Sequence, residues 1–323
     1  MEACTRWEED LLPVFPQGKR EMLAGLPVPV KNSLEEIRVR VGMPVSLLYR
    51  NEMGVMEDGA ANFIEDEASK VMTGEDCQAI FMNVTEHSVY AFESELNSGY
   101  ITLRGGYRVG MTGKTVYANG GWRLVNSTFF NFRISRQIMG AAQNLIGYIT
   151  DDGGVPYHTL IVSPPGLGKT TMLRDLARLF SGREGKPVKV CIVDERSEIA
   201  GCRNGVPQND IGTMTDVLDG CPKAEGIMMV LRTMSPNIII TDELGRAEDV
   251  QAVREALNAG VKVIASAHAA SMAELEMRPV LRTMMQEKIF ERLVILGLSL
   301  GIGTVESVFD CRTNEMVTNV PFK

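Results

Sequence analysis

The sequence contains no apolar run long enough to cross a membrane. Its longest candidate, Leu293 to Ile302, covers ten residues, about half of the roughly 20 that a membrane-spanning helix needs, and it predicts a buried strand followed by a turn. The first residues, MEACTRWEEDLLP, carry acidic side chains and no apolar segment typical of a secretory signal. We therefore expect a cytoplasmic protein.

Paired cysteines are absent as well. No C-x-x-C pair occurs among the six cysteines, which are Cys4, Cys77, Cys191, Cys202, Cys221 and Cys311. This spacing argues against a metal site and against a disulfide framework, and it favours isolated buried thiols in a reducing compartment.

Positive charge is in short supply. The 33 Lys and Arg residues are outnumbered by 41 Asp and Glu, which gives a net charge of −8. Nucleic-acid binders usually carry a basic stripe, so this balance argues against one, although it leaves a local basic channel open. With 45% hydrophobic and 23% charged residues, the chain is typical of a folded globular protein, and its 323 residues suffice for two domains.

The first 135 residues mix helical and strand patterns. Alternating apolar residues before and after Gly42-Met43-Pro44 predict two strands joined by a turn, and residues 74–96 are helical in character. Residues 98–125 predict successive strands, interrupted at 105–106, 113 and 120–121 by glycines. We expect a small α+β domain with an antiparallel sheet over residues 1–135.

The pattern changes after a predicted connecting helix at residues 136–150. From Tyr157 onward, short apolar strands alternate with helices, and the strands are expected at 160–163, 188–193, 237–241, 261–265 and 293–296. This alternation is typical of a parallel α/β sheet. We therefore assign residues 136–323 to a second, α/β domain.

A phosphate-binding loop is predicted where LIVSPPGLGKTT joins an apolar strand to an amphipathic helix. In such a loop, backbone N–H groups at a helix N-terminus surround a phosphate, a Lys reaches the β and γ oxygens, and a Ser or Thr holds Mg²⁺. The predicted nucleotide-binding residues are Ser163, Pro164, Pro165, Gly166, Leu167, Gly168, Lys169, Thr170 and Thr171. Ser163 replaces the first glycine of the usual G-x-x-x-x-G-K-[ST] pattern, and the alternative is a strand–turn–helix with a chance Gly-Lys-Thr.

Two apolar strands end in Asp-Glu, and this favours an ATPase core over a simple kinase. A hydrolase needs an Asp near Mg²⁺ and a Glu that polarises the attacking water. We expect Asp242, with Thr170, at the metal and Glu243 at the water. Asp194 and Glu195 fit a second acidic position, with Glu195 assisting; alternatively they are strand-end charges that face solvent.

His268 and several arginines complete the predicted site. His268 ends the strand VKVIASAH, at the edge where a parallel sheet binds its ligands, so we expect it to sense the γ-phosphate. A structural histidine is the alternative. Arginines neutralise charge in phosphoryl transfer, and candidates lie near the acidic motifs (Arg196, Arg232, Arg246) and late in the first domain (Arg104, Arg108, Arg133, Arg136). Arg232, Arg108 and Arg133 are the ones we predict to be catalytic.

With these residues in view, the chain resembles the secretion-ATPase branch of the RecA-like superfamily, which powers type II and type IV secretion and pilus retraction. Its four boxes correspond to residues 163–171 (Walker A), VDERSEIAG at 193–201 (aspartate box), VLRTMSPNIIITDELGRAED at 230–249 (Walker B) and ASAHAAS at 265–271 (histidine box). Longer strings, such as GYITLRGGYRVGMTG at 99–113 and PQNDIGTMTDVLDGCPKAEGI at 207–227, resemble the stage III sporulation protein AA family over about residues 35–312.

The resemblance implies a RecA-like P-loop NTPase domain with a mainly parallel sheet, preceded by a smaller α+β domain. It implies a Mg²⁺-dependent ATPase of endospore-forming bacteria that powers or assembles a channel between mother cell and forespore. Such a protein is expected on the mother-cell side as a homo-hexamer, peripheral to the membrane through integral-membrane partners. In secretion ATPases the N-terminal domain lends arginines to the site, which implies Arg104, Arg108 and Arg133 here. The chain departs from the family at Ser163 and at Met214, where a basic residue is expected.

The expected mechanism has ATP and Mg²⁺ bound at 163–171, Glu243 activating water and His268 reporting the γ-phosphate. Two other functions stay open at this point: a RecA-like nucleic-acid translocase, which the acidic composition disfavours, and a scaffold that binds nucleotide to set its assembly state. No nucleic acid is expected as a partner.

Overall fold

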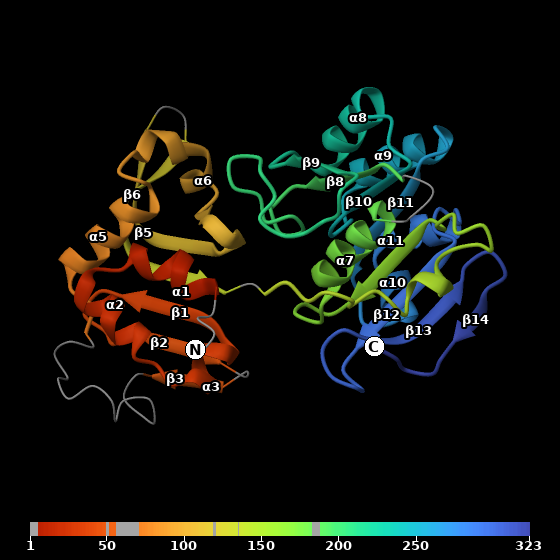
Figure 1. The fold of residues 1–323 in the computed structure, drawn as a ribbon. Helices are drawn as coiled ribbons and strands as arrows, with labels where there is room; N and C mark the ends of the chain where they lie inside the picture. Colours follow the sequence, from red (N-terminus) through yellow and green to blue (C-terminus); the bar gives the residue numbers. More distant parts are fainter. Residues whose placement is uncertain (1–5, 50–51, 56–70, 119–120, 135, 183–187) are drawn as a thin grey trace. The chain divides into compact units, whose positions relative to one another are not determined.

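The computed structural model describes residues 6–49, 52–55, 71–118, 121–134, 136–182 and 188–323. The chain divides into two compact units, residues 1–136 and residues 137–323, and each is described by itself (Figure 1). In the described residues, no helix is both long and apolar enough to cross a bilayer.

Unit 1 is built on a six-stranded sheet in the order β3-β2-β1-β6-β5-β4, and its paired strands run antiparallel. The strands are β1 (Leu34–Arg40), β2 (Ser46–Tyr49), β3 (Glu52–Val55), β4 (Tyr100–Thr102), β5 (Arg108–Ala118) and β6 (Gly121–Arg133). The helices are α1 (Arg6–Leu11), α2 (Gln17–Ala24), α3 (Val28–Ser33), α5 (Gly74–Val84) and α6 (Glu93–Asn97), with 3₁₀ turns η1 (Leu12–Val14), η3 (Val89–Phe92) and η4 (Arg104–Gly106).

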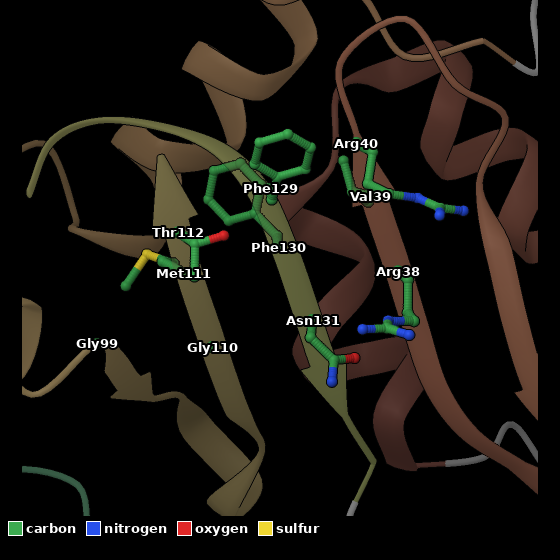
Figure 2. A pocket seen from close by; sticks show the side chains of 10 residues that line it. All are labelled: Arg38, Val39, Arg40, Gly99, Gly110, Met111, Thr112, Phe129, Phe130 and Asn131. Atoms are coloured by element: carbon green, nitrogen blue, oxygen red, sulfur yellow. The ribbon is translucent and has the colours of Figure 1, made fainter. Parts of the chain in front are cut away.

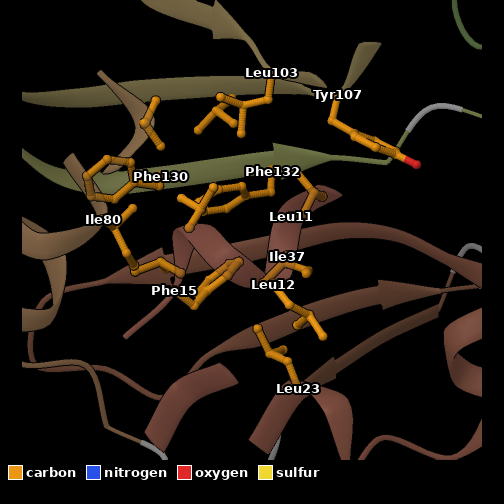
Figure 3. Close-up of a cluster of buried hydrophobic side chains, with 14 of the residues drawn as sticks. Leu11, Leu12, Phe15, Leu23, Ile37, Ile80, Leu103, Tyr107, Phe130 and Phe132 are labelled. Carbon is orange, nitrogen blue, oxygen red and sulfur yellow. The ribbon is translucent and has the colours of Figure 1, made fainter. Parts of the chain in front are cut away.

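The core of unit 1 lies between one face of this sheet and the helices. Ile37 and Phe132 point from the sheet toward Leu11 and Phe15 (Figure 3), and the rings of Phe15 and Phe132 have centroids 4.7 Å apart. The strand pair expected on either side of residues 42–44 is confirmed, with Ile37 opposite Leu47. Residue 113 is the position of a register shift inside β5, where a strand break was expected.

Unit 2 contains an eight-stranded sheet in the order β14-β13-β12-β7-β11-β10-β8-β9. The strands from β12 to β9 are parallel, and β13 and β14 add antiparallel to β12. Their bounds are β7 (Thr159–Ser163), β8 (Val190–Asp194), β9 (Thr215–Asp219), β10 (Ile238–Thr241), β11 (Lys262–His268), β12 (Arg292–Gly297), β13 (Thr304–Asp310) and β14 (Glu315–Thr318). All five strands predicted in this unit are present.

Helices cover both faces of this sheet because the central strands are buried on both sides. Ile161 packs with helix α7 (Lys169–Ser181) on one face. Its neighbours Leu160 and Val162 pack on the other face, where α8 (Lys223–Thr233), α9 (Ala247–Asn258), α10 (Met272–Met277) and α11 (Pro279–Gln286) lie. Parallel strands place their carboxyl ends at one edge, and the loops after them gather there.

The connecting helix predicted at 136–150 is wrong. The segment forms turns and one short 3₁₀ helix, η5 (Ile146–Tyr148). The Asp175 carboxylate accepts hydrogen bonds from the backbone N–H groups of Gly140 and Ala142 at 3.2 and 2.8 Å, and Gly140 has a φ of +81°. A left-handed residue tied to a neighbouring helix cannot continue an α-helix.

Candidate active site

The predicted phosphate loop lies between β7 and α7, at the carboxyl edge of the sheet. Gly166 and Gly168 both have positive φ, 78° and 93°, a conformation that favours glycine. A Cβ on Gly168 would also lie 3.3 Å from the Cα of Gly303. Gly168 caps the start of α7, so the first N–H groups of that helix are available for an anion.

Ser163 fits the position where the first glycine of the motif is usual. It is fully buried at the end of β7, and its hydroxyl donates to the Pro164 carbonyl at 2.8 Å. The same hydroxyl oxygen accepts a hydrogen bond from Lys169 at 3.1 Å. Ser163 therefore helps to hold the loop closed on its own lysine.

Lys169 is turned back into the loop. Its Nζ donates to the carbonyls of Ser163 and Pro164 at 2.8 and 3.0 Å, and it lies 3.1 Å from Nδ1 of His268. Burial lowers the pKa of Lys169, while the charge of Glu243 raises it. These carbonyl oxygens accept hydrogen bonds from the ammonium group, as phosphate oxygens would.

A continuous chain of hydrogen bonds joins Lys169 to Glu243. The Lys169 ammonium group has three N–H bonds for four neighbouring acceptors, which therefore share its protons; since an ammonium group only donates, Nδ1 of His268 faces it as an acceptor and the ring proton is assigned to Nε2. Nε2 then donates to Oε1 of Glu243 at 2.8 Å, and Arg196 donates to Oε2 at 3.1 Å. Glu243 is thus linked through the His268 ring to Lys169, the residue predicted to bind phosphate.

Glu243 is held in an unusual backbone conformation, with a φ of 36°. Its N–H donates to the Ser266 hydroxyl at 3.0 Å, and the N–H of Leu244 donates to the Ser266 carbonyl at 2.8 Å. Backbone strain of this kind, about 1–3 kcal/mol, persists where the surroundings enforce it and is frequent at functional sites. Here β11 enforces it and directs the carboxylate toward His268.

Asp242 is a buried carboxylate without hydrogen bonds. It is 2% exposed, and within the described part of the chain neither of its oxygens has a hydrogen-bond partner. Its nearest cation is Nζ of Lys223, 3.6 Å from Oδ1. Burial raises the pKa of Asp242, and Lys223 lowers it. Orphaned acceptor oxygens fit a cation, and Mg²⁺ commonly binds one or two carboxylates plus phosphate oxygens.

Asp194 does not face the phosphate loop. Its carboxylate accepts three backbone hydrogen bonds, from Glu198 at 2.8 Å and from Ile199 and Ala200 at 2.9 Å each. Burial raises its pKa to about 7, against these hydrogen bonds and with the help of the Asp242 charge. Asp194 therefore anchors the loop after β8, and the second acidic position expected for it near the γ-phosphate stays a prediction.

Glu195 is held by Lys223, a residue that the sequence analysis did not single out. Lys223 donates to Oε2 of Glu195 and so connects it to Asp242. Burial raises the pKa of Glu195, but Lys223, Arg246 and Arg196 outweigh it and keep that pKa low. These ion pairs hold the Glu195 carboxylate, and its predicted assistance to Glu243 stays a prediction. Only the position of Lys223, at the start of a helix near an acidic strand end, could have indicated its role.

One predicted arginine, Arg232, lies away from this site. Arg232 lies in the last turn of α8, whose first residue is Lys223 beside Asp242, so the helix carries Arg232 away from the carboxyl edge toward the start of β10. Arg108 and Arg133 belong to unit 1, where they are directly opposite each other on β5 and β6. Arg196, by contrast, contacts Glu243.

Comparison with known proteins identifies the family. The model of the family "Sporulation stage III, protein AA" matches residues 6–316. The stage III sporulation protein AA of Bacillus subtilis is 43% identical over 304 residues, which cover 93% of this chain and 94% of that protein. The chain belongs to the stage III sporulation protein AA family. The resemblance in the sequence is therefore confirmed.

Solved structures identify the fold. The ATPase DotB of Yersinia pseudotuberculosis superposes with a TM-score of 0.58 at 15% identity, over 95% of this chain and 78% of DotB. The pilus retraction motor PilT, solved with bound ADP, superposes with a TM-score of 0.52 at 12% identity, over 83% of this chain and 75% of PilT. This stage III protein AA homologue thus has the RecA-like fold of the secretion ATPases, as predicted, with a smaller α+β unit before it.

Proposed function

We propose that this chain hydrolyses ATP with Mg²⁺ at residues 163–171 and thereby powers or assembles a membrane channel during sporulation. The hydrogen-bonded chain from Lys169 through His268 to Glu243 carries the proposal, because it joins a phosphate-binding group to a water-activating group. Membership of a stage III sporulation family and a fold shared with secretion ATPases support it.

Binding of a triphosphate would displace the contacts that Lys169 now makes. Its ammonium group exchanges the carbonyls of Ser163 and Pro164 for β and γ oxygens, and the N–H groups at the start of α7 donate to the same phosphates. Lys169 then leaves Nδ1 of His268 without its donor. The imidazole becomes free to turn. Binding of phosphate in the loop therefore changes the hydrogen bond between His268 and Glu243.

Glu243 acts on water once a donor is released from it. In the ATP-free arrangement His268 and Arg196 donate to different oxygens of the carboxylate. Loss of the His268 contact exposes Oε1 as an acceptor for the attacking water, while Arg196 keeps the carboxylate in place. We assign Glu243 to the orientation of water and His268 to positioning, in line with the predicted γ-phosphate sensor.

Asp242 and Thr170 would hold Mg²⁺ together with phosphate oxygens. The ion supplies neutralisation of charge on the transferring phosphoryl group. Within the described residues no group of three or more His, Cys, Asp or Glu side chains is arranged around a common metal position. The ligand set therefore needs the nucleotide's own oxygens, which agrees with the preference of Mg²⁺ for phosphate and water.

The order of strands in the sheet indicates on which side of β7 the γ-phosphate and the base of the nucleotide lie. Glu243 and His268 follow β10 and β11, on one side of β7, so the γ-phosphate belongs there. The base then extends toward β12 on the other side. The loop after β12 exposes Leu298, Leu300 and Ile302, and its Gly303 approaches Gly168. We assign this apolar loop to contact with the base.

The assembly is part of the proposal. We infer a homo-hexamer in which unit 1 of one subunit supplies Arg108 and Arg133 to a neighbour's nucleotide, located in the mother-cell cytoplasm and bound to integral-membrane channel proteins. The exposed Arg133 lies opposite Arg108 on the adjacent strand, and Arg108 is half-buried against the Tyr100 ring; the pair supports a role between subunits.

Phosphate release from Mg-ATP tests the proposal. The Glu243→Gln variant keeps the size and polarity of the side chain, so ATP binding should persist while hydrolysis falls at least about 100-fold. Arg254→Ala on α9 is the control. It removes an exposed ion pair with Glu287 and should keep the parent rate. A parent without activity, together with a Glu243→Gln variant that supports sporulation, would favour the scaffold. Hydrolysis that requires DNA would favour the translocase.

A further inference from the structure

The outer face of the sheet in unit 1 is basic. Strand residues alternate between the faces, and Ile37 and Val39 of β1 belong to the buried core. Their neighbours Arg38 and Arg40 therefore lie on the opposite face, away from the core. In a chain of net charge −8, two arginines in alternate positions on one strand are a local exception.

A hollow lies beside these arginines. Asn131 of β6 is opposite Arg38 on one side and Gly110 of β5 on the other. Gly110 has no side chain to fill the space, since an added Cβ would find its nearest atom, the Asn131 carbonyl oxygen, at 3.9 Å. The resulting cavity has a volume of about 330 Å³ and is lined by Arg38, Val39, Arg40, Gly99, Gly110, Met111, Thr112, Phe129, Phe130 and Asn131 (Figure 2). We call it the Arg38 pocket.

Polar groups in the Arg38 pocket lack partners among the described residues. Arg38 is exposed and has no hydrogen bond or ion pair there. Arg40 donates one NH2 bond to the Ser46 hydroxyl, but its buried Nε has no acceptor, and the buried Oδ1 of Asn131 has no donor. In Figure 2 the Arg38 guanidinium and the Asn131 amide extend toward each other between β1 and β6. Buried polar atoms of this kind normally have a partner.

The lining contains no carboxylate that could neutralise the two guanidinium groups. The acid next along β1 on the same face, Glu36, is paired with Arg133 at 4.0 Å. The positive charge of the pocket is therefore uncompensated within the described part of unit 1. A guanidinium has five donors in a planar fork that matches carboxylate and phosphate oxygens.

We propose that the Arg38 pocket binds a small organic anion. Its carboxylate or phosphate group accepts from the Arg38 guanidinium, and a hydroxyl or amine on the ligand donates to Oδ1 of Asn131, while Arg40 extends away from Asn131 and adds its positive charge at the rim (Figure 2). The ring of Phe129, 46% exposed, forms an apolar wall for the rest of the molecule. A cavity of about 330 Å³ is at the small end of ligand sites, so a metabolite of nucleotide size or less fits it. The site belongs entirely to unit 1, where its Asn131 and Gly110 lie two residues along β6 and β5 from Arg133 and Arg108.

Calorimetric titration of the full chain tests this proposal, with Lys169→Ala as the parent so that the P-loop does not contribute. AMP and citrate are the probes, and inorganic phosphate measures the oxyanion contribution alone. Binding of AMP identifies a phosphate ligand, and binding of citrate a carboxylate ligand. Two variants address the pocket: Arg38→Ala removes the donor, and Gly110→Val fills the hollow at a φ that a branched side chain tolerates. Lys114→Ala, an exposed cation farther along β5, is the matched control.

We expect AMP or citrate to bind more tightly than inorganic phosphate. Arg38→Ala should weaken that binding at least tenfold, Gly110→Val should abolish it, and Lys114→Ala should change it less than about twofold, because charge-assisted hydrogen bonds require contact. The proposal is overturned if neither organic probe binds with a Kd below about 1 mM. It is also overturned if Arg38→Ala binds as the parent does, or if Lys114→Ala weakens binding as much as Arg38→Ala.

Discussion

Lys223 neutralises the carboxylates of Glu195 and Asp242. Replacing it with Met tests how much this charge contributes to the stability of unit 2. Met keeps the apolar stem of the side chain and removes the charge. At the 3.6 Å that separates Nζ from Oδ1 of Asp242, Coulomb attraction is worth about 5 kcal/mol at an effective dielectric constant of 20. Removing one partner of a buried pair usually costs about 3–5 kcal/mol, and we expect a loss in that range in the free energy of unfolding of unit 2 at pH 8.

The loss should depend on pH in a defined direction. Without Lys223, the pKa of Asp242 rises further above its unfolded value. The folded state then holds a proton that the unfolded state has released, so acidification restores stability. We expect a smaller deficit at pH 5 than at pH 8.

Hydrogen exchange is the suitable assay, because both tryptophans, Trp7 and Trp122, lie in unit 1 and do not report on unit 2. Protection of the β8 and β10 amides is compared between parent and variant at both pH values. Arg254→Met, which breaks an exposed pair with Glu287, should cost only about 0–1 kcal/mol. A deficit for Lys223→Met below 1 kcal/mol, or one equal at pH 5 and pH 8, would refute the reasoning.

Three further predictions concern the phosphate loop, the role of His268 and the dependence of stability on pH. Gly168→Ala should destabilise the chain by about 1–2 kcal/mol and weaken ATP binding in calorimetry, because φ is 93° and Gly303 is only 3.3 Å from the new Cβ; unchanged binding would contradict this. His268→Ala should lower the rate of phosphate release about 10- to 100-fold with ATP affinity nearly unchanged, and a parent-like rate would remove the positioning role. Because the pKa of Asp194 is raised to about 7 from about 3.9 in the unfolded chain, its contribution to stability should decline as pH rises from 4 to 7, and urea midpoints that rise over this interval would count against it.

Much of the fold could be predicted from the sequence because unit 2 is built on uniformly apolar strands. Residues of β7, β8 and β10 are buried on both faces, and such strands appear as continuous apolar runs. Strand β9 was missed for the opposite reason: it lies at the sheet edge, and its residues are mostly half-buried. The predicted connecting helix failed because Asp175, distant in sequence, fixes the backbone of that segment.

The candidate site could be predicted where a motif implies its own geometry. Glu243 and His268 follow adjacent parallel strands, so their proximity was expected from topology. The three backbone hydrogen bonds that Asp194 accepts in a local loop depend on side-chain directions that the spacing of residues does not encode. The same is true of the ion pairs of Lys223. Arg232 was assigned by nearness in sequence to the acidic motif, but the length of α8 separates it from that edge.

The most direct test of the central claim is a calorimetric titration of the Lys169→Ala chain with Mg-ATP beside the parent. If the loop after β7 binds the triphosphate, the parent binds ATP and the variant, which loses a charged hydrogen-bond donor to it, binds at least tenfold more weakly. Equal affinity of the two proteins for ATP would contradict the account.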